Sequence, residues 1–140
     1  MPTPSERDIR EFVIATTAEW NARNKAGYIG LWQQIAPNGA TLEDPVGSPP
    51  KHGWDHVSAM WDRFNPPCAE ERIEQLFVRG NEAAVLMYHR MVNEGEITEI
   101  RDIEIWRFEE GTLLIRCWWD PPESGAHKES LSVYEQAGAD

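Results

Sequence analysis

Cysteine is scarce in this sequence, and long apolar runs are missing. The two cysteines, Cys68 and Cys117, lie far apart, which excludes a CxxC pair and a disulfide framework and fits a reducing cytoplasm. The first residues, MPTPSERDIREF, do not combine a basic start with an apolar segment, so no signal peptide is expected. No apolar run approaches the ~20 residues of a membrane span, so we expect no membrane association.

Positive charge is also in short supply. The chain has 13 lysines and arginines against 24 aspartates and glutamates, for a net charge of -11. An acidic surface repels phosphate, which disfavours nucleic acids and anionic membranes as partners. The sequence contains no GxGxxG, no P-loop and no GxSxG motif. His52 and His56 are four residues apart, but His52 precedes Gly53 and no third ligand is in register, so we predict neither a metal site nor a cofactor.

Tryptophan, in contrast, is abundant. The seven tryptophans are Trp20, Trp32, Trp54, Trp61, Trp106, Trp118 and Trp119. Indole rings build cores by default, but they also line pockets for flat apolar ligands, and in a chain this small we expect at least one to contact a ligand. The length of 140 residues predicts a single domain over 1–140.

Three segments in the first half carry apolar residues at helical spacing. The first starts at a sequence resembling a capping box, Ser5 to Asp8, and ends near Gly27. The apolar stripes are Ile9, Phe12, Val13 and Trp20, then Ile29, Trp32, Ile35 and Ala36, then Val57, Met60, Trp61 and Phe64. Proline-containing turns at 37–39 and 65–67 end the second and third helices.

The remaining pattern is typical of strands. A short strand at 40–43 precedes Asp44-Pro45, and turn signals separate four further strands at 72–78, 83–92, 97–108 and 113–119. The pattern predicts an α+β domain, with three N-terminal helices packed on a curved antiparallel sheet and an internal pocket at its open end. From about residue 121 the sequence is polar, which predicts a mobile tail with one short helical turn near 131–135.

Two carboxylates, Asp44 and Glu104, have sequence neighbours that make them candidates for catalytic residues. Asp44 lies between a strand and a stiff proline-containing loop, although an aspartate before proline is also a common turn residue. Glu104 lies in IRDIEIWRF, where alternation places it on one face with Asp102 and Trp106. Both faces of this strand are mixed, so Glu104 could equally be a solvated residue of an exposed face.

His89 is a third candidate. It shares a strand face with Met87 and Met91, and a hydrogen-bonded core histidine is the simpler interpretation.

The stretch ATLEDPVGSPPKHG resembles a motif of the ketosteroid isomerases, A-T-V-E-D-P-x-G-x-x-P-x-x-G, within the NTF2-like (SnoaL-like) superfamily. The likeness extends from about Trp20 to Trp119 and includes the turn at Glu94-Gly95 and the pair Arg107-Phe108. It implies a cone-shaped α+β fold. It also implies a homodimer, with which an outer sheet face bearing Ile103 and Ile105 is compatible.

The resemblance implies roles for individual residues. Asp44 matches the proton-shuttling base, and Glu104 matches a protonated carboxylic acid of the oxyanion hole. Trp20 stands where the family has its main oxyanion-hole tyrosine, Trp61 where it has a supporting tyrosine, and Trp119 where it has an aromatic wall residue. An indole N–H is a weaker acid than a tyrosine hydroxyl.

The same registers place His89 and Asp102 in the cavity, where the family has apolar residues. The residues expected to contact the substrate are Trp61, Met87, His89, Met91, Asp102, Cys117 and Trp119.

Three functions follow as hypotheses. The first is a steroid Δ-isomerase-like enzyme that moves a proton next to a carbonyl on a small hydrophobic ring substrate. The second is a dehydratase, lyase, cyclase or epoxide hydrolase of the same fold, acting on a small aromatic or polyketide-like molecule. The presence of His89 near the carboxylates supports this hypothesis. The third is a non-catalytic binding module, since one fold hosts many functions.

Overall fold

The computed structural model of the chain describes residues 3–120. The tail and the short helical turn predicted beyond residue 120 lie outside this part. The order of elements is α1 (Glu6–Asn21), α2 (Lys25–Ile35), β1 (Gly39–Glu43), β2 (Lys51–His52), α3 (Trp54–Phe64), β3 (Cys68–Arg79), β4 (Glu82–Asn93), β5 (Glu96–Glu109) and β6 (Thr112–Trp118).

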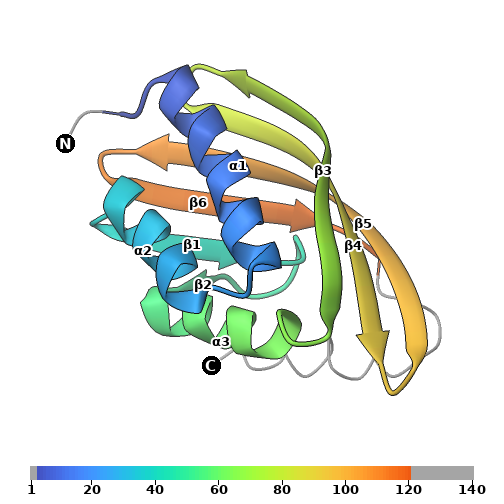
Figure 1. Cartoon of the computed structure of the whole chain (residues 1–140). Helices are drawn as coiled ribbons and strands as arrows, with labels where there is room; N and C mark the ends of the chain where they lie inside the picture. The colour runs from blue at the N-terminus through green and yellow to red at the C-terminus, as the bar shows by residue number, and fades with distance from the viewer. Residues whose placement is uncertain (1–2, 121–140) are drawn as a thin grey trace.

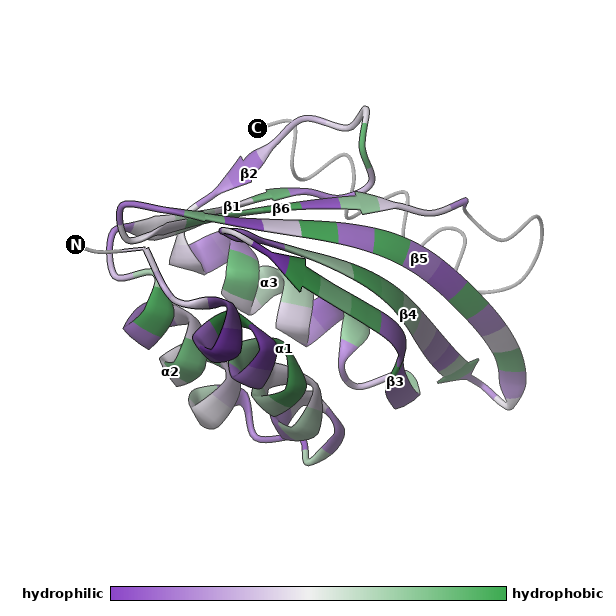
Figure 2. Ribbon diagram, turned by 90° about the horizontal axis from the view of Figure 1, so that it is seen from above, coloured by the Kyte–Doolittle hydropathy of each residue, from purple (hydrophilic) through white to green (hydrophobic). Residues whose placement is uncertain are grey.

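The strands form one curved sheet with the order β2-β1-β6-β5-β4-β3. The helices cover its concave side, and the long strands β3, β4 and β5 bend around them (Figures 1 and 2). The predicted α+β architecture is confirmed. The sequence did not predict that β1 runs parallel to β6, nor that β2 adds a short edge strand.

Local chemistry explains where the helices begin and which face they bury. The side chain of Ser5 accepts a hydrogen bond from the backbone N–H of Asp8, which caps α1 as the sequence predicted. The stripe of α1, with Ile9 and Phe12, is buried, and so are Val57 and Trp61 of α3. These stripes pack against the inner face of the sheet and close one core.

The β4–β5 hairpin determines which side chains face the helices. Its turn residues Glu94 and Gly95 both have positive φ, of 53° and 82°, as the tight hairpin turn requires. The pairing is regular and sets Asp102 opposite Met87 and Glu104 opposite Val85. These residues are buried. The sequence did not show which face of β5 points toward the helices, and the structure shows that it is the face carrying Asp102 and Glu104.

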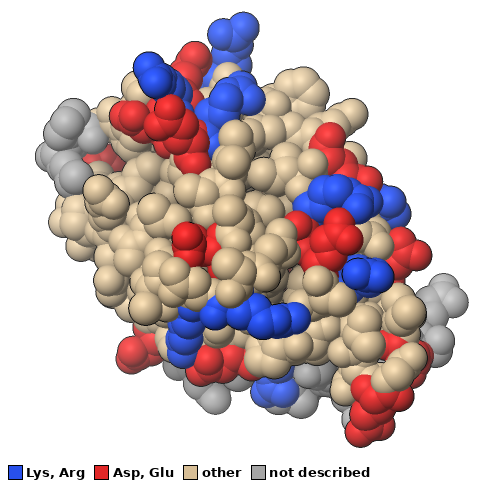
Figure 3. Space-filling model, viewed as in Figure 1, with Lys and Arg blue, Asp and Glu red and all other residues tan. Residues whose placement is uncertain are grey.

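The outer surface differs from this interior. Seen from the side of the helices, acidic and basic side chains gather mainly around the rim, and the middle of the face is mostly uncharged (Figure 3). No helix within residues 3–120 is long and apolar enough to cross a membrane. Cys68 and Cys117 are buried and unpaired. The cytoplasmic location stays a prediction from the cysteine pattern.

Candidate functional site

A pocket of about 120 Å³ lies between the helices and the inner face of the sheet. One water needs ~10–15 Å³ of such space, so the pocket has room for a small ligand. Eight of the ten residues predicted to form the site line it: Trp20, Asp44, His89, Met91, Asp102, Glu104, Cys117 and Trp119. The fold therefore gathers side chains from α1, β4, β5, β6 and the segments that follow β1 and β6.

Two predicted residues do not line the pocket. The ring of Trp61 packs against the rings of Trp20 and Tyr28, with centroids 5.0 Å away in each case. Met87 is fully buried in β4, opposite Asp102. Both therefore support the site from the core rather than forming its wall.

Asp44 lies directly after β1, and its peptide bond to Pro45 is cis. The indole N–H of Trp119 donates a hydrogen bond to its Oδ1, and the buried Lys51 donates from Nζ to its backbone carbonyl at 3.0 Å. Burial raises the pKa of Asp44 to about 6, against the opposing effect of the Trp119 hydrogen bond, and the charge of Asp102 adds to the rise. Asp44 is therefore ionised at neutral pH and still basic enough to accept a proton.

Glu104 occupies a different environment in the same pocket. It is buried on β5, and Trp106 donates from Nε1 to its Oε1 at 2.9 Å. Burial raises the pKa of Glu104 well above its usual value, and the neighbouring Asp102 raises it further. This rise favours the uncharged carboxylic acid, which can donate a hydrogen bond.

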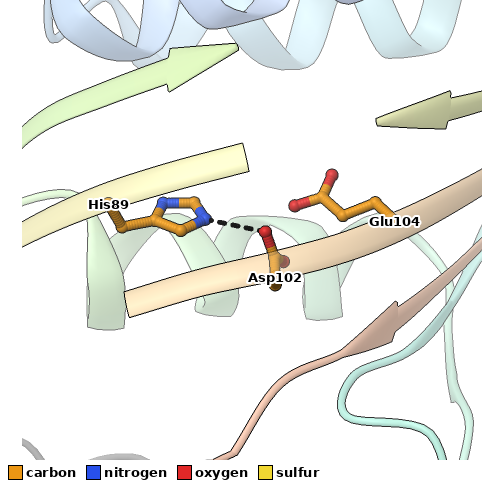
Figure 4. Close-up of side chains that lie close together, drawn as sticks. All are labelled: His89, Asp102 and Glu104. Carbon is orange, nitrogen blue, oxygen red and sulfur yellow. Dashed lines mark hydrogen bonds and ion pairs between the residues drawn. The ribbon is translucent and has the colours of Figure 1, made fainter. Parts of the chain in front are cut away.

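His89 lies between two carboxylates. Its Nε2 is 3.3 Å from Oδ1 of Asp102, as Figure 4 shows, and its Nδ1 is 3.7 Å from Oε2 of Glu71. Burial opposes a charged imidazole. The hydrogen bond to Asp102 and the charges of Asp102 and Glu71 outweigh burial and hold the pKa of His89 well above its usual value. These interactions favour the charged imidazolium form of His89.

Glu71 was missed by the sequence interpretation, which began this strand at Arg72. Residues that pair directly across antiparallel strands share a face, and Glu71 pairs with His89. The register shifts by one residue between Ile73 and Gln75, so that Glu74 is an extra, bulged residue. If β3 and β4 paired without this bulge from their connecting turn onward, Arg72 would lie opposite His89. Burial raises the pKa of Glu71 to about 7, although the charge of His89 opposes the rise.

The aromatic wall is also larger than predicted. Tyr28, Trp32 and Trp106 also line the pocket, and of these Trp32 was predicted as part of the apolar stripe of its helix. The indole Nε1 groups of Trp20 and Trp32 are buried and have no hydrogen-bond acceptor among the described residues. Such unpaired donors are costly in a protein interior, so they mark a place where a ligand oxygen could bind.

One set of side chains has metal-binding geometry. The donor atoms of His89, Asp102 and Glu104 lie within 4.8 Å of one another, and Figure 4 shows the Glu104 carboxyl group directed toward Asp102. A metal ion would have to displace protons from His89 and Glu104, whose pKa values are both raised, and this competition lowers metal affinity. The ion pair of His89 with Asp102 accounts for the grouping without a metal.

No family model and no curated protein matches this sequence. Solved structures do match. One is a protein described as a SnoaL-like polyketide cyclase from Jannaschia sp. CCS1, with a TM-score of 0.65 and 16% identity over 86% of this chain and 90% of that one. Another is SalBIII, an epoxide hydrolase/cyclase-like enzyme of pyran ring formation in the polyether salinomycin, with a TM-score of 0.68 and 19% identity over 83% and 93% of the two chains.

An NTF2-like protein of unknown function from Cytophaga hutchinsonii has a TM-score of 0.61 and 15% identity, over 86% of this chain and 96% of that one. The chain has the NTF2-like fold. The predicted fold is thereby confirmed. At these identities the comparisons establish the architecture alone, since one fold hosts many chemistries.

Proposed function

We propose that the protein is an acid–base enzyme of the ketosteroid isomerase type, which moves a proton next to a carbonyl group. The observation that carries the proposal is the pair of carboxyl groups in one pocket whose environments separate their pKa values. Asp44, with a pKa of about 6, is mainly ionised at neutral pH, whereas burial and the charge of Asp102 favour the protonated form of Glu104. Two such groups can take the roles of base and hydrogen-bond donor.

In the proposed mechanism Asp44 removes a proton from the carbon beside the carbonyl. The negative charge that develops on the carbonyl oxygen accepts a hydrogen bond from the carboxylic acid of Glu104 and a second one from the indole N–H of Trp20. Asp44 then returns the proton to another carbon of the conjugated enolate. Donors aimed at charge that develops only in the transition state lower the barrier without strengthening ground-state binding equally.

The wall of the pocket supports a small hydrophobic ring-containing substrate. Trp20, Trp119, Met91 and Cys117 line it beside the carboxylates. An apolar wall excludes water, which strengthens hydrogen bonds to the developing charge and keeps Glu104 neutral.

A second candidate function is elimination, cyclisation or epoxide opening by a dehydratase, lyase, cyclase or epoxide hydrolase. The contact of His89 with Asp102 favours it, since a charged imidazole can protonate a leaving oxygen. Two structural neighbours are described as a polyketide cyclase and as an epoxide hydrolase/cyclase-like enzyme. The third hypothesis, a non-catalytic binding module, predicts ligand binding without turnover.

The pH dependence of proton transfer tests the proposal. A β,γ-unsaturated ketosteroid is mixed with the protein, and the absorbance of the conjugated product is followed; exchange of α-protons with deuterium in smaller ring ketones is followed by NMR. We expect kcat/KM to rise with pH through about 6, because Asp44 must be ionised to act as the base. A profile that is highest below pH 5 or that rises only above pH 8 would contradict Asp44 as the base.

We also propose a homodimer formed through the outer face of the sheet. Ile103 pairs directly with Trp118 across β5 and β6, and their side chains are 53% and 40% exposed. Adjacent exposed apolar side chains mark interaction surfaces. We expect a dimer in light scattering after size-exclusion chromatography and a monomer for Ile103→Glu. A monomeric native protein at micromolar concentration would contradict the proposal, and Ile14→Glu, on the exposed face of α1, is the control.

A further inference from the structure

The charges that line the pocket are unbalanced. Four carboxyl groups line it, from Asp44, Glu71, Asp102 and Glu104, whereas His89 is the one basic side chain among the described residues of its wall. Lys51 donates to the backbone carbonyl of Asp44 and does not line the pocket, but its charge also acts on the Asp44 carboxyl group and opposes the rise of its pKa. Within residues 3–120 the wall therefore has more acidic than basic side chains and contains neither lysine nor arginine, and Asp44 and Asp102 carry most of its negative charge.

The carboxyl groups share one electrostatic field. Burial is the main cause of the raised pKa values of Asp44, Glu71 and Glu104, and in each case the charge of Asp102 adds to it. A charge that raises the pKa of three neighbours stands close to all of them. A second cation near Asp102 would relieve this repulsion, which His89 alone does not cancel.

A second, independent feature indicates that the pocket is built for a ligand. Trp20 and Trp32 are 5% and 1% exposed, they line the pocket, and their Nε1 donors have no acceptor among residues 3–120. They lie on the helical wall, while Asp102 and Glu104 lie on the sheet. A ligand oxygen at the helical wall would satisfy a donor that the fold leaves unpaired.

We propose that the pocket takes a ring-containing organic cation, an amine that is protonated at neutral pH, in preference to a neutral or anionic molecule of the same shape. The inference rests on the proposed function only in taking this pocket as the ligand site, and it narrows the substrate to a ring ketone that also carries a basic nitrogen.

Carboxylates and aromatic rings of the pocket wall both favour a bound organic cation. Burying an ammonium group is costly unless carboxylates replace its water. The wall supplies the carboxylates of Asp44 and Asp102, and Glu71, with a pKa of about 7, is partly ionised at neutral pH. The tryptophan and tyrosine rings of the same wall add surface to which organic cations are attracted. An anionic ligand, in contrast, would be repelled by Asp44 and Asp102, whose charges Lys51 and His89 offset only in part, and would bind more weakly.

A matched series of probes tests the charge preference. Naphthylmethylammonium, naphthylmethanol and naphthoate have similar ring size and differ in charge, and isothermal titration calorimetry at neutral pH and about 0.15 M salt measures their binding to the full chain. We expect the ammonium probe to bind about tenfold or more tightly than the alcohol, and the carboxylate to bind more weakly than the alcohol.

Variants in the pocket should change this preference in opposite directions. Asp102→Asn removes one charge with little change of shape. Because Asp102 also holds the proton on His89, the change is made in the His89→Gln background, where we expect it to reduce the ratio of ammonium to alcohol affinity about tenfold. Glu71→Gln is a second variant of the same kind. His89→Gln removes the competing cation and should increase the ratio. Glu96→Gln, on the exposed start of β5, changes the net charge equally and should leave the ratio within about twofold.

The inference is overturned if the alcohol binds as tightly as the ammonium probe, if none of the probes binds, or if Glu96→Gln lowers the ratio as much as Asp102→Asn. The test of charge preference is independent of the test of proton transfer, because calorimetry measures binding without turnover. Proton transfer on a neutral ring ketone together with equal binding of all probes would retain the proposed function and reject the cationic substrate. Preferential binding of the ammonium probe without any proton transfer would do the reverse.

Discussion

Replacing Asp44 with asparagine is expected to lower kcat for proton transfer by about 10²–10⁴-fold, the usual contribution of a positioned general base. Asparagine has nearly the same shape, and its Oδ1 can still accept the hydrogen bond that Trp119 donates to Asp44. The variant should therefore fold and bind ligand normally while losing the proton acceptor. Deuterium exchange into a ring ketone, measured by NMR, gives the rate, and calorimetry gives the binding.

The matched control is Asp55→Asn, which changes the same residue type at an exposed position in the first turn of α3. We expect its rate to equal that of the native protein within about twofold. If Asp44→Asn retained the native rate while His89→Ala abolished it, the elimination or ring-opening mechanism would replace the isomerase mechanism. If the native protein and both variants bind ligands but turn over no substrate, the result would support the non-catalytic binding module.

Replacing Glu104 with alanine is expected to reduce kcat by about 10²–10³-fold, since one donor to a developing oxyanion contributes about 3 kcal/mol. Burial raises the pKa of Glu104 and so favours the protonated form, which can donate. The loss should appear in kcat more than in KM, because the donor meets its charge mainly in the transition state. Steady-state kinetics with the ketosteroid, alongside a thermal melt of each variant, measure the effect.

Glu104→Gln separates catalysis from structure. The glutamine oxygen can accept the bond from Nε1 of Trp106, as Oε1 of Glu104 does, and its amide is a weaker donor than a carboxylic acid. We therefore expect an intermediate loss of roughly tenfold, with native stability. A native kcat in Glu104→Ala, with the fold intact, would remove Glu104 from the mechanism.

Much of the architecture could be predicted from local sequence because local chemistry sets it. The capping serine Ser5, the apolar stripes of three helices and the turn at Glu94-Gly95 act over a few residues, and each appears where the pattern placed it. The α+β class follows from their order. Asp44 was found through its motif, and the structure places it in the pocket.

The composition of the pocket could not be predicted in the same way. On β5 both faces were mixed, and only packing of the helices on the sheet determined that Asp102 and Glu104 face inward and Ile103 faces outward. Trp61 has the right spacing for the pocket wall, yet ring packing with Trp20 keeps it in the core. These outcomes depend on which surfaces meet in three dimensions.

The clearest division between sequence and tertiary structure is at His89. The sequence by itself determined that a histidine shares a strand face with apolar residues, and that an Asp-Pro motif precedes a stiff loop. Only the tertiary structure decided the partner of His89, because the bulged Glu74 shifts the β3 register by one residue. Successive strand residues point to opposite faces, so this shift exchanges Arg72 for Glu71 at the wall and makes the pocket acidic.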